Sequence, residues 1–193
     1  PLRYPGGKSR AVTKMCPLFP YLSEYDEFRE PFLGGGSVAL YITKKYPHLD
    51  VWVNDLYEPL VNFWQQLQIV GEDLSERLQD YKATHSHPES ARELFKVAKE
   101  RVNDEEQSPF NRACYFYVIN KCSFSGLTEA SSFSKQASDS NFSLRGIEKL
   151  PEYSRIIKDW KITNESYETL LSLKERTFLY LDPPYDIKDN LYG

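Results

Sequence analysis

The chain alternates short apolar runs with segments that repeat apolar residues at helical spacing. Strand-like runs lie at residues 28–32, 51–53, 160–163 and 178–181. Helical spacing follows the first two of them, at 38–46 and from 59 to about 70. A strand, a turn, a helix and a second strand form a βαβ unit. The pattern therefore predicts a parallel sheet with right-handed crossovers.

The pattern changes in the middle of the chain, between about residues 72 and 158. Residues 91–102 and 113–120 have helical spacing. Residues 121–145 are rich in Ser, Phe and Gly, which predicts an exposed loop or hairpin. A short helix at about 167–173 then leads to the last strand. The sequence thus predicts an α/β core formed by residues 1–71 and 159–193, interrupted by a mostly helical insert at 72–158.

Composition bounds the class of protein. The 193 residues suffice for one domain or one and a half, and 40% apolar with 15% aromatic residues can form a sizeable core. The net charge of −4 does not by itself indicate a nucleic-acid-binding protein. Residues 107–161, however, hold eight Lys and Arg residues and five acids. A locally basic face is one interpretation, and a solvated face of mixed charge is the other.

Cysteine and histidine usage gives no sign of a disulfide framework or a metal site. Cys16, Cys114 and Cys122 are scattered and form no C-x-x-C pair, which favours reduced thiols in a cytoplasmic protein. The three histidines, at 48, 85 and 87, have no other potential metal ligands grouped with them in the sequence, so no metal is expected. No segment is apolar for long enough to span a membrane, and no signal peptide opens the chain.

A glycine turn follows the first predicted strand. Gly34, Gly35 and Gly36 allow the backbone to turn tightly and approach a ligand closely. Ser37 is placed to cap the next helix, whose free N–H groups favour negative charge. A plain tight turn is the alternative interpretation. The spacing is not G-x-G-x-x-G, which disfavours a dinucleotide, and residues 6–9 lack the upstream glycine of a P-loop.

An acid stands at the end of the next predicted strand. Asp55 lies about 20 residues beyond the glycines, where an acid of a nucleotide-binding fold hydrogen-bonds ribose hydroxyls. The alternative is an N-cap for the following helix. The residue type and position support both interpretations equally.

The last predicted strand, apolar throughout and therefore expected to be buried, ends in Asp182, Pro183, Pro184 and Tyr185. Two successive prolines stiffen the turn. It presents a carboxylate, backbone carbonyls and an aromatic face together. Two acceptors can hold the hydrogens of a planar NH₂ group while its ring stacks on Tyr185. The alternative is a proline turn without chemical function.

Four motifs in this order carry a family resemblance: YPGGK at 4–8, EPFLGGGS at 30–37, VNDLYEPLVNFW at 53–64 and LDPPY at 181–185. They resemble the Dam-type DNA adenine methyltransferases, over essentially the whole chain. The resemblance implies an α/β fold with a Rossmann-like class I methyltransferase sheet and a target-recognition insert ahead of the DPPY strand. Family members continue for several strands and helices beyond this motif, so the C-terminal part of the sheet is expected to be missing from this chain.

The resemblance also implies a cofactor and a reaction. S-adenosylmethionine would provide the methyl group, and the N6 amino group of a flipped-out adenine would receive it. Asp182 and the Pro183 carbonyl would hold that amino group, and Tyr185 would stack on the base. The residues implied in cofactor binding are Tyr4, Lys8, Pro31, Phe32, Gly34, Gly35, Gly36, Asp55 and Asp182.

For DNA binding, the resemblance points to the start of the Ser-rich segment. It implies contacts from Asn120, Lys121, Phe124, Ser125, Glu129 and Lys135. Phe124 would enter the duplex beside the flipped base, with a buried core aromatic as the alternative. Glu129 stands where readers of GATC carry an arginine. A carboxylate cannot donate to guanine O6 and N7 but can accept from cytosine N4, so GATC specificity is not expected.

The chemistry of the site agrees with this reading. Hydrogen bonds from N6–H to Asp182 and to a carbonyl orient the nitrogen lone pair and stabilise its developing charge. The base must first leave the duplex. The expected partner is double-stranded DNA, with a cognate restriction endonuclease as a further candidate, for a monomer in the cytoplasm of a bacterial, archaeal or phage-infected cell. Two alternatives stay open: methylation of cytosine N4, and a non-catalytic DNA-binding fragment.

Overall fold

The computed structural model describes residues 1–4, 10–124 and 131–184. Its sheet has four strands: β1 (Glu27–Glu30), β2 (Asp50–Asn54), β3 (Lys161–Thr163) and β4 (Thr177–Leu179). The order is β3-β2-β1-β4, and every neighbouring pair is parallel. The predicted parallel sheet is therefore confirmed. Each of the four predicted runs overlaps one of these strands, and the bounds agree within a few residues at each end.

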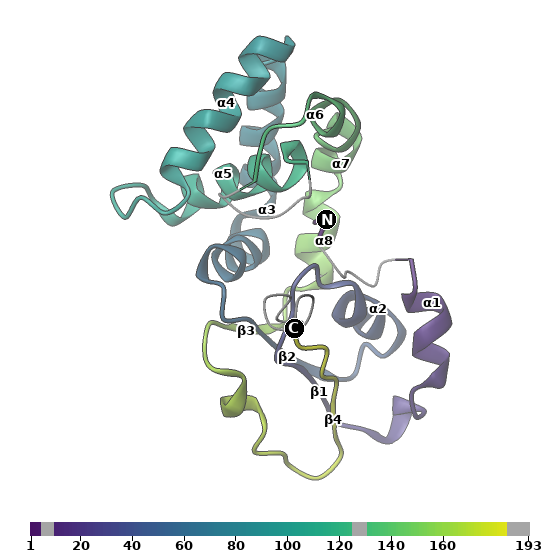
Figure 1. Ribbon diagram of the computed structural model, residues 1–193. Helices are drawn as coiled ribbons and strands as arrows, with labels where there is room; N and C mark the ends of the chain where they lie inside the picture. The colour runs from purple at the N-terminus through teal and green to yellow at the C-terminus, as the bar shows by residue number, and fades with distance from the viewer. Residues whose placement is uncertain (5–9, 125–130, 185–193) are drawn as a thin grey trace, which may run out of the picture.

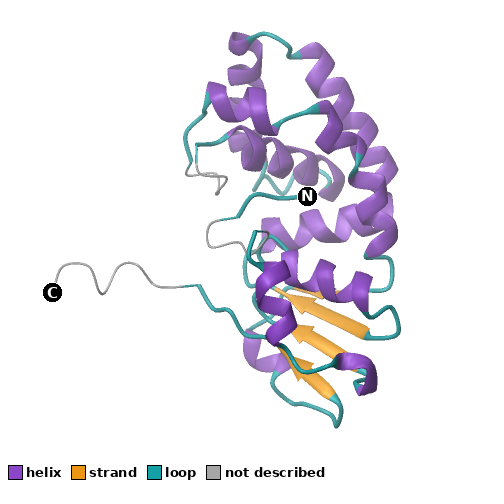
Figure 2. Cartoon of the chain, turned by 90° about the vertical axis from the view of Figure 1, so that its right-hand side faces the viewer, coloured by secondary structure: helices purple, strands orange, loops and turns teal. Residues whose placement is uncertain are grey.

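Helices form the larger share of the chain. Beside the sheet lie α1 (Val12–Met15), α2 (Ser37–Lys45) and the 3₁₀ turns η1 (Cys16–Leu18), η2 (Leu22–Glu24) and η3 (Tyr167–Leu170). The others are α3 (Glu58–Thr84), α4 (Pro88–Arg101), α5 (Pro109–Cys122), α6 (Lys135–Asn141), α7 (Leu144–Glu148) and α8 (Leu150–Ile156). Figures 1 and 2 show two parts, a sheet part that contains the strands and a helical part beyond it.

Helix α3 joins the two parts. Before Val70 it contacts the sheet part through the buried Trp64, whose indole N–H donates to the Gly34 carbonyl at 3.2 Å and whose ring lies 5.6 Å from that of Trp160. Val70 itself leaves the helical conformation, with φ −131° and ψ 40°, at the position where the sequence predicted the helix to end. The chain instead resumes the helix beyond this kink. There Gly71 allows α8 to approach, because a Cβ atom on it would lie 2.5 Å from Cβ of Ser154.

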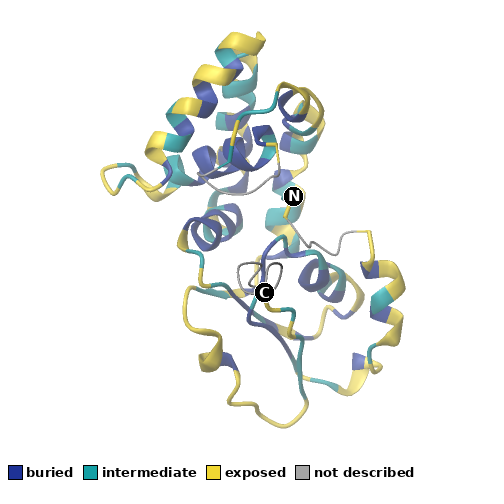
Figure 3. Ribbon diagram, viewed as in Figure 1, coloured by how far each residue is buried: buried dark blue, intermediate teal, exposed yellow. Residues whose placement is uncertain are grey.

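One hydrophobic cluster runs through both parts of the molecule. It extends from the sheet through α3 into α5, and the buried residues in Figure 3 follow this path. Two neighbouring residues of α3 contact the two sides: the Trp64 ring lies 5.6 Å from that of Trp160, next to β3, and the Phe63 ring stacks on Tyr117 of α5 at 5.9 Å. Burial of such large rings stabilises both parts together.

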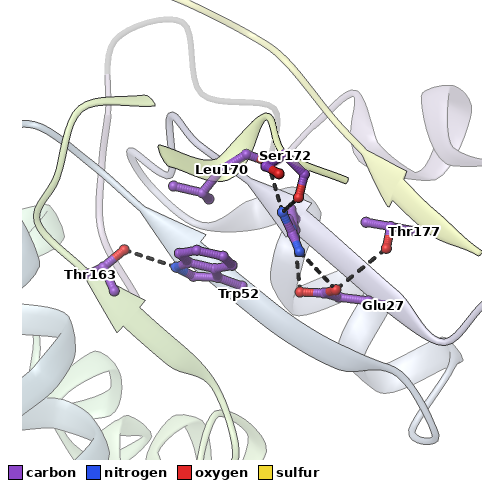
Figure 4. Close-up of polar contacts among 7 residues, drawn as sticks. Glu27, Trp52, Thr163, Leu170, Ser172 and Thr177 are labelled. Carbon is purple, nitrogen blue, oxygen red and sulfur yellow. Dashed lines mark hydrogen bonds and ion pairs between the residues drawn. The ribbon is translucent and has the colours of Figure 1, made fainter. Parts of the chain in front are cut away.

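A polar network connects the strands of the sheet to the segment around η3. The Arg29 guanidinium donates to the carbonyls of Leu170 and Ser172, each at 3.0 Å, and pairs with Glu27 at 2.9 Å (Figure 4). It also lies 4.8 Å from the centroid of the Trp52 ring. The indole N–H of Trp52 donates to Thr163 Oγ1 at 2.9 Å. These contacts tie β1, β2 and β3 to the η3 loop.

Three expectations need correction. The segment 121–145 was predicted to be an exposed loop or hairpin. An antiparallel bridge between Ser123 and Phe133 agrees with a hairpin, but the segment also contains α6, and α7 begins at its end. Serines that suggest a loop are N-caps here: Ser134 accepts from the Ala137 amide at 3.1 Å. Strand β4 was expected to be buried and is half-buried, since in the described residues only β1 pairs with it. The short helix at 167–173 is the single turn η3.

Candidate cofactor and DNA site

The residues that follow three of the strands lie at one edge of the sheet. The turn 33–36 follows β1, Asp55 follows β2 and Asp182 lies beyond β4. Because the strands are parallel and in register, their carboxyl ends meet at this edge, where open α/β sheets bind ligands. The electrostatics agree with this placement, since Asp182 and Asp55 both act on the Glu30 carboxyl.

The turn after β1, residues 33–36, is called the glycine turn below. Gly34 and Gly36 have φ values of +53° and +75°, which glycine adopts without strain. A Cβ atom on Gly36 would lie 2.6 Å from Cζ2 of Trp64, whose indole N–H donates to the Gly34 carbonyl at 3.2 Å. The turn therefore requires glycine both for its backbone and for its support. The expected cap by Ser37 is wrong, because Gly36 is the N-cap and Ser37 is the first residue of α2.

Asp55 holds the glycine turn against the start of α3. Its Oδ2 accepts from the Gly34 N–H at 3.0 Å, and its Oδ1 accepts from the Tyr57 N–H at 3.1 Å. Burial raises the pKa of Asp55, and these backbone hydrogen bonds oppose that rise. The N-cap of α3 is Tyr57, so the alternative of an N-cap at Asp55 is wrong. A carboxylate has about four acceptor positions, which leaves room for ligand hydroxyls.

Glu30, at the end of β1, is a site residue that sequence reasoning missed. Its side chain is buried, and Oε2 has no hydrogen-bond partner among residues 1–4, 10–124 and 131–184. Burial raises its pKa well above the ordinary value, and the charges of Asp182 and Asp55 raise it further. The sequence signal that could have identified Glu30 is its place at the start of the EPFLGGGS motif, shortly before the glycine turn. An unpaired buried carboxyl oxygen beside two other acids fits a positively charged ligand group.

Other residues named for the cofactor surround the same turn. The Tyr4 ring covers Gly34, on which a Cβ atom would lie 3.0 Å from Tyr4 Cδ1. Burial, and secondly Asp55, raise the pKa of Tyr4 to about 12. Phe32 is half-buried with its ring 5.3 Å from that of Tyr167. The Pro31 carbonyl accepts from the Asn54 side chain at 3.2 Å.

The DPPY motif is described in part. Asp182 is half-buried, while Pro183 and Pro184 are exposed. Tyr185 lies outside the described residues, as does Lys8. Among residues 1–4, 10–124 and 131–184, no three His, Cys, Asp or Glu side chains are grouped to hold a metal ion. In the same ranges, no helix has the length and apolarity needed to cross a membrane.

The residues named for DNA contact differ in their surroundings. Asn120 is buried, Lys121 is half-buried, and Phe124 is 81% exposed, so the alternative of a buried core aromatic is wrong. Burial, and secondly the Arg3 charge, lower the pKa of Lys121 to about 8. Lys135 is exposed at the start of α6. Ser125 and Glu129 lie outside the described residues.

Known proteins resemble this chain throughout its length. Residues 4–192 match the family of D12 class N6 adenine-specific DNA methyltransferases. The type II methyltransferase M.MjaIII of Methanocaldococcus jannaschii is 23% identical over 199 residues, covering 95% of this chain and 68% of the relative. M1.LlaDCHI of Lactococcus lactis subsp. cremoris is 23% identical, covering 95% and 64%. M.CviBI of Paramecium bursaria Chlorella virus NC1A is 22% identical, covering 100% and 71%.

The sheet and the ligand edge define a mixed α/β fold of the class I methyltransferase type. The chain belongs to the D12 class N6 adenine-specific DNA methyltransferase family, which confirms the predicted resemblance and enzyme class. It spans about two thirds of the length of the curated relatives named above.

Proposed function

We propose that this chain provides the cofactor-binding and catalytic edge of an enzyme that transfers a methyl group from S-adenosylmethionine to adenine N6 in DNA. The observation that carries the proposal is the convergence of Glu30, Asp55 and Asp182 beside the glycine turn. DNA is the substrate of the family. The cofactor and the roles of individual residues are what we propose here.

The donor groups at the sheet edge fit S-adenosylmethionine. The cofactor supplies an activated methyl group on a cationic sulfonium centre and also carries an ammonium group, a carboxylate and ribose hydroxyls. Glu30 Oε2, which is buried and has no partner in the part of the chain that the structure describes, suits one of the cationic groups. Asp55 has acceptor positions left for ribose hydroxyls, and the glycine turn lets the backbone approach closely. Tyr4, Pro31 and Phe32 line the same turn; Lys8 is assigned from the motif alone.

The DPPY motif would receive the target base. Asp182 and the Pro183 carbonyl accept the two N6 hydrogens, and Tyr185 stacks on the ring. These hydrogen bonds turn the N6 lone pair toward the methyl group and stabilise the positive charge that develops on nitrogen. The new N–C bond forms as the S–C bond breaks, and one N6 proton then leaves to Asp182 or to water. Unstacking the base costs a few kcal/mol, which DNA contacts must supply.

The insert at 72–158 would supply those DNA contacts. Phe124 is the strongest candidate, since a large exposed aromatic is suited to stack in a duplex from which a base has been removed. Lys121 and Lys135, with Ser125 and Glu129 from the motif, would complete the contact surface. Asn120 is buried and pairs with the Arg3 main chain, so it would act on this surface only indirectly. The division into a core of residues 1–71 and 159–193 and an insert follows the change at Val70, where α3 leaves the sheet part.

Methylation mapping of DNA tests this function directly. The full-length gene is expressed in a host that lacks methylation, and N6-methyladenine and N4-methylcytosine are mapped across the genome. The proposal expects N6-methyladenine at one short motif. N4-methylcytosine instead would identify a cytosine-specific enzyme. No modification, together with DNA binding, would support a non-catalytic DNA-binding protein. Calorimetry with S-adenosylmethionine tests the cofactor separately.

A further inference from the structure

The N-terminal residues lie between the sheet part and the helical part (Figures 1 and 2). Within them, two neighbouring residues make contacts in opposite directions. The Tyr4 ring covers the glycine turn, and Arg3 contacts the end of α5. Consecutive Cα atoms are about 3.8 Å apart across a trans peptide bond. A single peptide unit therefore joins the cofactor edge to the segment that carries Phe124.

Arg3 and Asn120 form a closely matched pair, although 117 positions separate them in sequence. The Arg3 N–H donates to Asn120 Oδ1 at 2.9 Å, and Asn120 Nδ2 donates to the Arg3 carbonyl at 2.5 Å. The side-chain amide thus pairs with the main chain as a neighbouring strand would. Asn120 is 1% exposed, so an unpaired amide there would be costly. This pair fixes the position of the N-terminal residues along α5.

The Arg3 guanidinium then holds the residues that follow α5. It donates to the carbonyls of Ser123 at 3.0 Å and of Asn120 and Phe124 at 3.4 Å. The last carbonyls of a helix have no partner within it, and a cation there is favoured by the helix dipole. One planar guanidinium can serve several such acceptors, which a lysine ammonium cannot do with the same geometry.

The same backbone is fixed from its other side. The Phe124 N–H donates to the Ser132 carbonyl at 3.0 Å, and the Ser134 N–H donates to the Cys122 carbonyl at 2.8 Å. We call these paired residues, 122–124 and 132–134, the hairpin base. Its backbone is held at both edges, yet the Phe124 side chain is exposed. A rigid backbone that presents a large exposed aromatic is suited to insert into a ligand at a defined position.

We propose that Arg3 and Asn120 are positioning residues that set the hairpin base relative to the glycine turn, so that cofactor and DNA bind cooperatively. The inference rests on the proposed function. A ligand at the glycine turn restrains Tyr4, and through the next peptide it restrains Arg3 and the hairpin base. DNA that engages Phe124 restrains the same link from the hairpin base, so the second ligand to bind loses less conformational entropy in residues 3 and 4 than the first. Coupling is reciprocal, so DNA raises cofactor affinity by the same factor.

The test measures this coupling factor in the full-length protein. The affinity of S-adenosylhomocysteine, which cannot transfer a methyl group, is determined by calorimetry with and without a short duplex that carries the mapped site. The ratio of the two dissociation constants is the coupling factor, expected to be at least about 5 in the unmodified protein. Arg3→Ala and Arg3→Lys are compared with Arg155→Ala, a control that removes an exposed arginine of α8.

We expect both Arg3 variants to reduce the coupling factor to below about 2 while their cofactor affinity without DNA stays unchanged. Arg3→Lys retains the charge, so the salt dependence of its DNA binding should match that of the unmodified protein. Arg155→Ala should keep the full coupling. Thermal denaturation verifies that each variant is folded. Substitution of Asn120 is avoided as the primary test because this residue is buried.

Three results would contradict the inference. A coupling factor near 1 in the unmodified protein, with both ligands bound, would show that cofactor and DNA bind independently. Full coupling in Arg3→Ala would show that Arg3 does not transmit the coupling between the two ligands. Equal loss of DNA affinity with and without cofactor, and a salt slope lower by about 1, would make Arg3 a direct phosphate contact instead. Failure of the unmodified protein to bind S-adenosylhomocysteine at all would count against the proposed function itself.

Discussion

The amide of Gly34 donates a hydrogen bond of 3.0 Å to the carboxylate of Asp55, 21 residues further along the chain. This contact joins the turn after β1 to the residue after β2. It makes Asp55 a structural part of the glycine turn as well as a candidate ligand for ribose. The two roles have different experimental consequences, because a ligand contact is measured by affinity and a structural contact by stability.

Asp55→Ala should therefore weaken both cofactor binding and folding. Loss of a hydrogen bond to a charged group costs about 1.5–3 kcal/mol, so S-adenosylmethionine affinity should fall about 10-fold to 150-fold. The Gly34 and Tyr57 amides also lose their acceptor, so the free energy of unfolding should fall by about 1–3 kcal/mol. Calorimetry and denaturant unfolding measure the two effects. The control is Asp50→Ala, which removes an exposed acid from the same strand. Unchanged affinity would exclude Asp55 from the cofactor site.

Asp182→Asn should act mainly on the chemical step. The charge of Asp182 stabilises positive charge that develops on N6 only in the transition state, so kcat should fall by about 100-fold or more. Cofactor affinity should change much less. Single-turnover methylation of the mapped duplex measures the rate. Asp159→Asn, at an exposed position after α8, serves as the control. A near-normal rate in Asp182→Asn would disprove the proposed mechanism.

Glu30→Gln should stabilise the ligand-free protein at neutral pH. The folded-state pKa of Glu30 is raised above its ordinary value of 4.5, so the folded protein binds a proton more tightly than the unfolded chain. The cost to stability is absent below about pH 4.5 and grows as the pH rises toward the folded-state pKa. Removing the charge should raise Tm at pH 8 by about 2–4 °C for each kcal/mol gained. At pH 4 the two proteins should have the same Tm.

The same variant should lose affinity for the cofactor. A cation that binds beside Glu30 favours the ionised carboxylate, so binding releases a proton and becomes tighter as the pH rises toward neutrality. Glu30→Gln should remove this proton release, which calorimetry in buffers of different ionisation enthalpy measures. Identical proton release in both proteins would show that Glu30 does not face the bound cation.

Gly36→Ala should destabilise the protein more than Gly35→Ala. An alanine at φ +75° costs about 1–2 kcal/mol, and its methyl group would meet the Trp64 ring at 2.6 Å. At Gly35, whose φ is not positive, the methyl group would lie 3.1 Å from Tyr4 Cβ, at the edge of the site. Denaturant unfolding of both variants measures the difference. Equal stabilities would show that the turn relaxes away from Trp64.

Recognition of GATC is not expected. The family resemblance assigns Glu129 to the position at which GATC readers carry arginine, and a carboxylate there could not donate to guanine. Glu129→Arg should therefore change the methylated motif more than it changes cofactor affinity, since each wrong base pair costs about 1–3 kcal/mol. A genome-wide methylation map of both proteins measures this. N6-methyladenine found predominantly at GATC with Glu129 in place would show that another residue contacts guanine.

Much of the ligand edge follows from local sequence. Asp55 directly follows β2, the glycines at 34 and 36 and Asp182 lie a few residues beyond β1 and β4, and parallel strands end at the same edge. The alternation of short strands with helical periods was therefore enough to predict both the sheet and the position of these residues. The sequence predicted that the helix ends at about Val70, and the structure instead has a kink there, beyond which the helix resumes.

The tertiary structure alone decided which groups lack partners and which distant residues meet. Glu30 belongs to a motif, but its unpaired buried oxygen results from the packing of helices and loops around it. Arg29 meets the Leu170 carbonyl 141 positions away, and Arg3 meets Asn120 117 positions away. Periodicity and motif spacing report only contacts along one element or between neighbouring ones. Pairings over such distances depend on how the two parts of the molecule are packed, because α3 and its kink set where α5 ends relative to the sheet.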